Sequence, residues 1–446
     1  MMDKARETAI KVLQEVHEKG AYANVALAQA LRRTELTDQD RRFVTELVYG
    51  TVKAGETLDW ILRRYINRPL SKVPPMIREI LRLGLYQIFY LDKVPSSAAC
   101  NTAVDLAKRY GHKGTAGFVN AVLRTAVREP EKAAFPHGKG HATEELALKS
   151  QHPLWLVKRW VKEFGFEDTE RLCQFNNESA RLCLRANTLR CNREELLEEL
   201  KACGAEAEAS VWTEEGVVVN AHGALDELTP LKEGRAQVQD ESSMLVAHVV
   251  APQPGEFVLD CCSAPGGKTT HMAALMENKG RIVAGDIYEH KLARIEENAQ
   301  RLGISIIETI MLDARDAGGR FKGQADRVLV DAPCSGLGVL RRKPDARWHK
   351  EQKEIDALPE LQLEILKSAA EAVKPGGVLV YSTCTIERSE NQAVVEAFLR
   401  GNPAFQLEKT GCFLPCRGEH RQEDMVQLYP QHDGTDGFFI ARMRRV

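Results

Sequence analysis

The first third of the chain repeats apolar residues at the spacing of an α-helix. Between residues 3 and 20 the apolar positions fall on one helical face. Similar patterns follow Thr37, which is placed to cap a helix, and Pro75, and they continue over 97–110 and 116–127. Because short polar turns separate these segments, we expect residues 1–128 to form an all-α helical bundle.

The middle of the chain shows weaker and more varied patterns. Residues 129–150 lose helical periodicity and are rich in Pro and Gly near their centre, so we expect a linker there. Residues 151–235 mix helical and strand patterns, and we expect them to form a small α+β module. These patterns are a helix containing Trp155 and Trp160, a helix over 192–203, and strands near 182–185 and 216–219.

From residue 236 to 446, short apolar runs alternate with helical patterns. Alternation at this spacing predicts a Rossmann-like α/β domain whose sheet is mostly parallel and covered by helices on both faces. The expected strands are 256–260, 281–286, 308–313, 326–331, 376–382 and 437–443. The expected helices lie near 267–277, 289–302, 355–373 and 389–400.

Composition and charge add one prediction about partners. With 43% hydrophobic and 28% charged residues the chain has the composition of a folded protein, which argues against long disordered tracts. The net charge of −2 hides an asymmetry, because residues 1–150 hold 24 Lys and Arg against 17 Asp and Glu. This basic excess of seven predicts a polyanionic partner, and a solvated helical surface is the alternative.

The chain has 11 cysteines but no visible signal peptide, and no apolar run approaches the roughly 20 residues of a membrane helix. We therefore expect a cytoplasmic protein with reduced cysteines and no membrane partner. Cys412 and Cys416 are four residues apart, but no second pair completes a zinc site, so we expect no metal. We expect six cysteines to be small buried hydrophobic residues: Cys100, Cys173, Cys183, Cys191, Cys203 and Cys261.

A Gly-rich turn follows the expected strand that ends at Asp260. In the segment Ala264-Pro265-Gly266-Gly267-Lys268, the glycines let the backbone approach a ligand, and the helix that follows offers free N–H groups. The spacing matches neither the dinucleotide motif nor the P-loop, which disfavours a dinucleotide or a triphosphate. A purely structural turn is the alternative interpretation.

Aspartates end the next three expected strands. Asp286 can accept both hydroxyl groups of a ribose, and Asp313 can receive an adenine amino group. Asp331 ends the fourth strand. Any one of them could simply form a turn or cap a helix, but three in succession favour a nucleoside-binding edge.

Two cysteines follow expected strands in the same domain. Cys334 comes after 326–331 and Cys384 after 376–382. Because the carboxyl ends of parallel strands share one crevice, both thiols are expected to face it. A thiolate is a strong nucleophile when its pKa is lowered, and Lys268 or a helix N-terminus could lower it.

Several longer segments resemble the Sun family of RNA cytosine-5 methyltransferases, which use S-adenosylmethionine. Residues 1–128 resemble the helical, RNA-binding NusB-type domain. A NusB-type domain joined to a methyltransferase domain resembles the bacterial 16S ribosomal RNA branch of the family. Departures are small: Ser263 stands where the family often has Ala, and Ala325 where a larger apolar residue is usual. The matching segments are 262–268, 326–336, 381–385, Glu390-Asn391-Gln392 and 433–439.

The resemblance implies methyl transfer to C5 of a cytosine in 16S ribosomal RNA. It implies that Cys384 is the nucleophile and that Cys334 assists breakdown of the adduct, while Asp331 and Lys268 are assigned hypothetically to the base. The helical domain and the 151–235 module would hold RNA, free or in an assembling small subunit, with no obligate protein partner. The expected contacts of S-adenosylmethionine are Cys262, Ser263, Ala264, Pro265, Gly266, Gly267, Lys268, Asp286, Asp313 and Asp331.

Two other functions remain as alternatives. Pro333-Cys334 is similar to the Pro-Cys nucleophile of DNA cytosine-5 methyltransferases, but Thr383-Cys384 and the lack of a large target-recognition region argue against that class. A non-catalytic RNA-binding or antitermination factor could be built on the helical domain. A methyl-donor pocket with two cysteines in its crevice argues against that function.

Overall fold

The computed structural model describes residues 3–138, 140–221, 228–415 and 419–446. The chain forms two compact units. The helical unit contains Met1–Glu178 together with Leu340–Lys350, and the sheet unit contains Ser179–Val339 and Glu351–Val446. The chain therefore leaves the sheet unit at Val339 and returns to it at Glu351.

The described part of the helical unit is all-α, which confirms the bundle predicted from apolar periodicity. Asp3 and Thr37 cap the first and third helices, because their side chains accept hydrogen bonds from the N–H groups of Arg6 (2.9 Å) and Asp40 (3.2 Å). The helices are α1 Lys4–Lys19, α2 Ala23–Arg33, α3 Asp38–Arg63, α4 Pro75–Tyr90, α5 Ser96–Tyr110, α6 Lys113–Arg128, α7 Ala142–Lys149, α8 Leu154–Phe164, α9 Phe166–Asn177 and α16 Ala346–His349.

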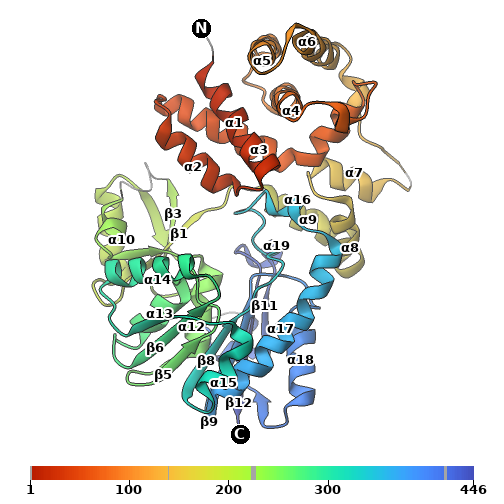
Figure 1. Ribbon diagram of the computed structural model, residues 1–446. Coiled ribbons are helices and arrows are strands. Elements are labelled where there is room, and N and C mark those ends of the chain that lie inside the picture. The colour runs from red at the N-terminus through yellow and green to blue at the C-terminus, as the bar shows by residue number, and fades with distance from the viewer. Residues whose placement is uncertain (1–2, 139, 222–227, 416–418) are drawn as a thin grey trace. The chain divides into compact units, whose positions relative to one another are not determined.

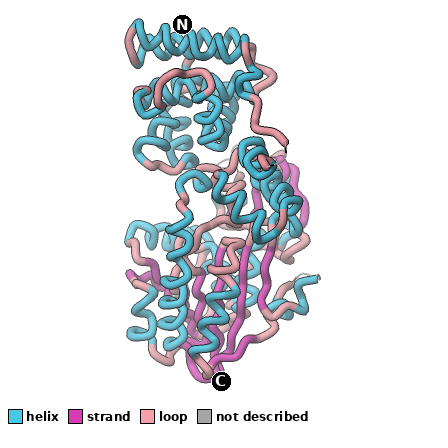
Figure 2. The backbone as a smooth tube through the Cα atoms, turned by 90° about the vertical axis from the view of Figure 1, so that its right-hand side faces the viewer, coloured by secondary structure: helices cyan, strands magenta, loops and turns pink. Residues whose placement is uncertain are grey.

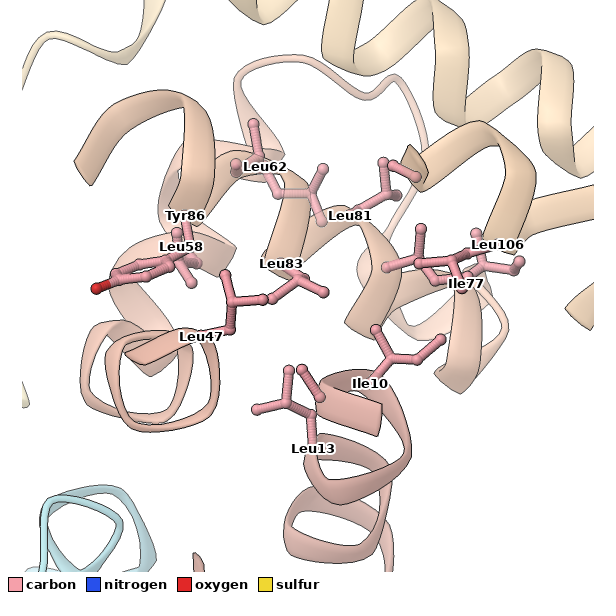
Figure 3. Close-up of a cluster of buried hydrophobic side chains, with 14 of the residues drawn as sticks. Ile10, Leu13, Leu47, Leu58, Leu62, Ile77, Leu81, Leu83, Tyr86 and Leu106 are labelled. Carbon is pink, nitrogen blue, oxygen red and sulfur yellow. The ribbon is translucent and has the colours of Figure 1, made fainter. Parts of the chain in front are cut away.

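One hydrophobic core joins α1 to α6, and Figure 3 shows side chains from several of these helices pointing toward one another. Leu13, Leu47 and Leu58 are completely buried in it. The segment 129–150, expected to be a linker, contains the 3₁₀ helix η2 (Pro130–Ala133) and α7.

The segment Leu340–Lys350 is fixed inside the helical unit by two side chains. Arg347 is fully buried and donates hydrogen bonds to the carbonyl oxygens of Gln151 (3.0 Å) and Asn176 (3.1 Å). The Trp348 indole donates to the carbonyl oxygen of Lys53 (3.1 Å). At Gly55, where α3 is kinked with φ +31°, a Cβ atom would lie 2.4 Å from Trp348 Nε1, so this contact needs glycine.

The sheet unit begins with a four-stranded sheet in the order β2-β3-β1-β4. All neighbours in it are antiparallel. Helices α10 and α11 occur in the order β-α-β-β-α-β, which confirms the expected α+β character of this segment. Its elements are β1 Leu182–Ala186, α10 Arg193–Ala202, β2 Glu206–Ala209, β3 Gly216–Ala221, α11 Thr229–Lys232 and β4 Ala236–Val238.

A larger mixed sheet follows in the order β10-β12-β9-β8-β5-β6-β7, with β11 paired to β12. Strands β5 to β9 are parallel to their neighbours within this group, and β12 runs antiparallel to β9. Figure 2 shows these strands side by side. They are β5 Phe257–Asp260, β6 Arg281–Asp286, β7 Ile307–Met311, β8 Ala325–Asp331, β9 Val373–Thr383, β10 Phe405–Leu407, β11 Met425–Leu428 and β12 Phe438–Arg445.

Helices cover both faces of this sheet, as predicted. Successive strand residues point to opposite faces, so Val258 packs with α12 and α13 whereas Leu259 packs with α17 and α18. In Figure 1 α12, α13 and α14 lie on one side of the sheet and α15, α17 and α18 on the other. The helices are α12 Glu241–Val250, α13 Gly267–Leu275, α14 Glu289–Leu302, α15 Ala317–Phe321, α17 Gln352–Ala372, α18 Gln392–Gly401 and α19 Pro430–Asp433. Among the described ranges, no helix has the length and apolar character needed to cross a bilayer.

Candidate active site

The carboxyl edge of the large sheet collects most of the residues singled out from the sequence. Asp260, Asp286 and Asp331 are the last residues of β5, β6 and β8, as predicted. Cys384 directly follows β9. Because β6, β5, β8 and β9 are parallel neighbours, their ends meet at one edge of the sheet.

The Gly-rich turn between β5 and α13 is held by hydrogen bonds on both sides. Ser263 donates to the carbonyl oxygen of Gly285 from both its N–H and its hydroxyl, each at 2.9 Å. Gly266 has φ +94°, and a Cβ atom there would lie 3.3 Å from the Cα atom of Ile295. Glycine at this position therefore lets the turn lie against α14, and α13 begins at the next residue.

Asp260 lies beneath this turn and is almost completely buried. Its Oδ2 accepts a hydrogen bond from the Thr269 hydroxyl at 2.7 Å, while Oδ1 has no hydrogen-bond partner among the described residues. Burial, with a smaller contribution from the charge of Asp331, raises the pKa of Asp260 to about 7. A buried acceptor without a donor is a place where a ligand's donor group can bind.

The two other predicted nucleoside contacts differ in their surroundings. Asp286 is 9% exposed, and its Oδ1 accepts a hydrogen bond from Tyr288 N at 3.1 Å. Asp313 lies two residues beyond the end of β7, so the expected strand 308–313 ends early, at Met311. Asp313 caps a short 3₁₀ helix and pairs with Arg315 (2.7 Å), whose hydrogen bond lowers the pKa of Asp313. Its role toward adenine stays a prediction.

Lys268 and Asp331 form an ion pair at the edge. Lys268 Nζ lies 2.7 Å from Asp331 Oδ2, and Ser382 Oγ donates to the other carboxylate oxygen at 2.9 Å. Burial lowers the pKa of Lys268, but the charge and hydrogen bond of Asp331 outweigh burial, so the pKa is raised overall. Lys268 is therefore an ammonium group at neutral pH. Phe438 also contacts it, with Nζ 5.0 Å from the ring centre.

The two cysteine sulfurs are in contact. Cys334 Sγ and Cys384 Sγ lie 3.4 Å apart, and both residues are partly exposed. The hydrogen bond with Cys384, together with burial, raises the pKa of Cys334 well above its ordinary value. The expectation that Lys268 or a helix N-terminus lowers the thiol pKa is therefore wrong for Cys334, because the hydrogen bond with Cys384 and burial raise it. Cys334 keeps its proton at neutral pH.

A buried glutamate supports the loop that carries Cys334, and sequence reasoning assigned it no role. Glu390 accepts hydrogen bonds from Ser335 N (2.8 Å) and Gln362 Nε2 (3.0 Å), and also from the Ser335 hydroxyl. Gln362 donates in addition to the carbonyl oxygen of Pro333 at 2.9 Å. The only signal in the sequence is that Glu390 lies in one of the family-like segments.

A second contact links the two cysteine loops directly. Gly338 N donates to the carbonyl oxygen of Cys384 at 3.0 Å, and Gly437 N donates to that of Gly338 at 2.8 Å. A Cβ atom on Gly338 would lie 2.1 Å from the Gly437 carbonyl oxygen, so a larger residue cannot occupy this position. The loops after β8 and β9 are therefore held together by main chain as well as by the cysteine pair.

The remaining cysteines follow the prediction with one exception. Cys100, Cys173, Cys183, Cys191 and Cys261 are buried as expected. Cys203 is exposed, because it follows the last turn of α10 at the surface, so that prediction is wrong. Cys412 is exposed, and its expected neighbour Cys416 lies outside the described residues. Cys262 in the Gly-rich turn is partly exposed, and burial of its sulfur raises its pKa.

Comparison with protein families matches three segments of the chain. Residues 247–444 match the family described as 16S rRNA methyltransferase RsmB/F, and residues 3–128 match the NusB family. Residues 152–226 match the ferredoxin-like domain of RsmF/B-like methyltransferases. The strand order of the small sheet agrees with this third match.

Similar proteins extend over the full length. A probable ribosomal RNA small subunit methyltransferase B of Bacillus subtilis is 43% identical, covering 99% of this chain and 98% of its own length. A ribosomal RNA small subunit methyltransferase B of Pseudomonas syringae is 34% identical, covering 99% of this chain and 97% of its own length. The crystal structure of PH0851 is similar over 100% of this chain and 100% of its own, with 28% sequence identity and a TM-score of 0.84. The structure of NSun6 from Pyrococcus horikoshii with SFG covers 65% of this chain and 97% of its own, with 27% identity and a TM-score of 0.58. The chain thus belongs to the RsmB/F family of 16S ribosomal RNA methyltransferases.

Proposed function

We propose that the protein transfers a methyl group from S-adenosylmethionine to C5 of a cytosine in 16S ribosomal RNA, through a covalent bond between Cys384 and C6. The observation that carries the proposal is the cysteine pair, with sulfurs 3.4 Å apart, beside the ion pair of Lys268 and Asp331 at the same sheet edge. Membership of an rRNA methyltransferase family leaves the DNA-modifying and the non-catalytic alternatives without support.

The turn and the strand ends fit S-adenosylmethionine. The first turn of α13 offers N–H groups for the carboxylate of the methionine part, and the unpartnered Oδ1 of Asp260 can accept from its ammonium group. We assign Asp286, the last residue of β6, to the ribose hydroxyls and Asp313 to the adenine amino group. Cys262, Ser263, Ala264, Pro265 and the glycines after them complete the proposed contacts. When bound, S-adenosylmethionine supplies an electrophilic methyl group on a sulfonium sulfur.

The chain's own residues have to make C5 of cytosine nucleophilic. Addition of the Cys384 thiolate to C6 moves the electrons of the C5–C6 double bond toward C5 and gives an enamine-like adduct. We assign Asp331 and Lys268 to the N3 and N4 edge of the base, where the ammonium group can stabilise the negative charge that the addition creates. Ser382 holds the Asp331 carboxylate in place.

Release is an elimination in which a base takes the C5 proton, the electrons of that bond restore the C5–C6 double bond, and the Cys384 sulfur leaves as a thiolate. Cys334 keeps its proton and lies 3.4 Å from that sulfur, so its S–H can stabilise the departing thiolate. The base has to be unpaired or flipped out to reach the thiols. The basic helical domain and the 151–235 module are the proposed holders of the RNA backbone.

The test is to identify the methylated nucleoside. The full chain is incubated with methyl-labelled S-adenosylmethionine and either 16S ribosomal RNA or DNA of the same sequence, and the digested product is separated by chromatography. The expected product is 5-methylcytidine from RNA only. Label on the exocyclic N4, or label in DNA, would contradict the proposal, and Cys384→Ser serves as the control without a nucleophile of normal reactivity.

A further inference from the structure

Arg185, a buried arginine of the small sheet, donates hydrogen bonds to the first turn of α13, the helix that follows the Gly-rich turn. Arg185 lies in β1 and is 1% exposed. Its Nη1 donates to the carbonyl oxygen of Gly267 at 2.8 Å and to the side-chain oxygen of Gln239, and its Nη2 donates to the Thr270 hydroxyl at 3.1 Å. Gly267 and Thr270 both belong to the first turn of α13.

Burying the positive charge of Arg185 in this environment is unfavourable in free energy. Within the described ranges its hydrogen-bond partners are neutral oxygens, and Arg185 Nε is buried without a partner. Burial lowers the pKa of Arg185 to about 9, although the more distant charge of Glu215 opposes this. A buried charge satisfied only by neutral acceptors reduces the free energy of unfolding relative to an apolar side chain of the same volume. The hydrogen bonds of Arg185 to α13 therefore point to a role other than packing.

Glu215 also approaches α13 from the same small sheet. It immediately precedes β3, and its Oε1 lies 2.9 Å from His248 Nε2 on α12 and 3.0 Å from His271 Nε2 on α13. Burial and the nearby Arg185 charge lower the pKa of His271 to about 3, so this ring is neutral at physiological pH. The ligand atoms of these three residues lie within 4.8 Å of one another, but the neighbouring Arg185 charge disfavours a metal cation there.

We propose that Arg185 is a positioning residue for the cofactor turn: it fixes the first turn of α13 so that the backbone of 262–268 is set to receive S-adenosylmethionine. The small sheet would then contribute to cofactor binding and not to RNA binding alone. This rests on the proposed function in one respect, the identity of the cofactor.

The test compares Arg185 with a matched buried arginine of the same unit. Arg185→Met removes the three donated hydrogen bonds, and Arg185→Lys keeps the charge but cannot reach all three acceptors. Arg442→Met is the control, because Arg442 is equally buried and bonds to the carbonyl oxygens of Val249 and Val250 at the end of α12, away from the turn. Affinity for S-adenosylmethionine and for S-adenosylhomocysteine is measured calorimetrically on the full chain without RNA.

Arg185→Met should weaken both ligands by about tenfold or more, since hydrogen bonds from a charged group that preorganise the site are lost. Arg185→Lys should restore part of the affinity, and Arg442→Met should leave it within about twofold of wild type while lowering thermal stability. In steady state the KM for S-adenosylmethionine should rise and the KM for RNA should not. If Arg185→Met does not fold, Gln239→Met, which removes the side-chain acceptor of Arg185 Nη1, should weaken binding by a few-fold.

Three results would overturn the proposal. They are unchanged cofactor affinity in Arg185→Met, an equal loss in Arg442→Met, and a rise in the KM for RNA alone. A wild-type chain that does not bind S-adenosylmethionine would instead remove the proposed function itself, so the two failures are distinguishable.

Discussion

Cys334 and Cys384 are 50 residues apart in the chain, yet their sulfur atoms lie 3.4 Å from each other. The distance follows from topology, because β8 and β9 are adjacent parallel strands and each is followed by one of the cysteines. Asp331 pairs with Ser382 in the strand register, so the two loops leave the sheet side by side. Two thiols in contact allow addition and release at one base to be handled by different sulfurs.

The two cysteines should fail in opposite ways when replaced. Cys384→Ala cannot form the bond to C6 and should be inactive, whereas Cys334→Ala should still attack and transfer methyl but release the RNA slowly. On a denaturing gel, a protein–RNA band should appear with Cys334→Ala and be absent with Cys384→Ala. A band seen only with Cys384→Ala would make Cys334 the nucleophile.

The proposed cofactor site predicts an order among its acidic residues. Asp286→Ala should weaken S-adenosylmethionine binding by about tenfold or more, because a charged acceptor for the ribose is removed. Asp313→Ala should have a smaller effect, since its carboxylate is more exposed and already bonded to Arg315. Calorimetric titration of both variants measures the order. Unchanged affinity in Asp286→Ala would take that residue out of the cofactor site.

Strands β5, β6 and β8 could be predicted closely because they are apolar runs that end at an aspartate, whereas β10, β11 and α12 were not expected. Both β6 and α14 were expected with the bounds that they have, 281–286 and 289–302. Strand β9 begins at Val373 and not at 376, because Pro375 and Gly376 are typical of a turn and hide the pairing of Val373 with Ala325. Helix α7 was missed for a similar reason, since the Pro- and Gly-rich residues before it indicate a loop.

Long-range contacts could not be predicted in the same way. Arg347 and Trp348 carry no local signal that the segment after Cys334 packs inside the helical unit. Glu390 and Arg185 resemble ordinary charged residues of a helix and a strand, and only the three-dimensional structure shows their burial. Polar residues that support a site through tertiary hydrogen bonds have no fixed spacing from the residues that they support.

The basic surface of residues 1–128 should bind RNA electrostatically. Arg32, Arg33 and Arg42 are exposed on α2 and α3. Replacing all three with Ala should reduce the slope of log affinity against log salt by about 2, since each phosphate contact to a single strand contributes about 0.7. Filter binding of the full chain over a range of salt concentrations measures this slope. The affinity of this variant for S-adenosylmethionine should equal that of wild type. An unchanged salt slope would instead favour the interpretation that these arginines form a solvated surface.

His420 gives the sheet unit a pH-dependent contribution to stability. Its hydrogen bond to Asp433 (2.7 Å) and the charge of that residue outweigh burial and raise the pKa of His420 to about 9 from 6.5. Because the folded pKa is the higher one, the stabilisation is complete below pH 6.5 and is lost as the pH rises through 9.

Urea unfolding of wild type and His420→Gln should therefore differ most below pH 6.5, and the difference should shrink toward pH 9. A difference that stays constant across this range would mean that His420 is not protonated by its pairing with Asp433.

Glu390 should control catalysis without touching the cofactor. Its Oε2 accepts from Ser335 N and Gln362 Nε2, and its Oε1 accepts from the hydroxyls of Ser335 and Thr385, so Glu390→Gln removes the negative charge that strengthens these bonds. Loss of charge-assisted hydrogen bonds to a buried carboxylate should cost about 1.5–3 kcal/mol and displace the loop that carries Cys334. Turnover should fall, and the rate of adduct release should fall with it, while affinity for S-adenosylmethionine stays at the wild-type value.

Glu408→Gln is the matched control, because Glu408 pairs with Arg442 and Arg444 on β12 and lies in the same unit. It should lower stability but leave the rates of adduct formation and release unchanged. Equal loss of turnover in both variants would mean that Glu390 acts through global stability. Loss of turnover in Glu390→Gln alone, with the cofactor still bound, would mean that the buried carboxylate sets the position of Cys334 relative to the sulfur that has to leave.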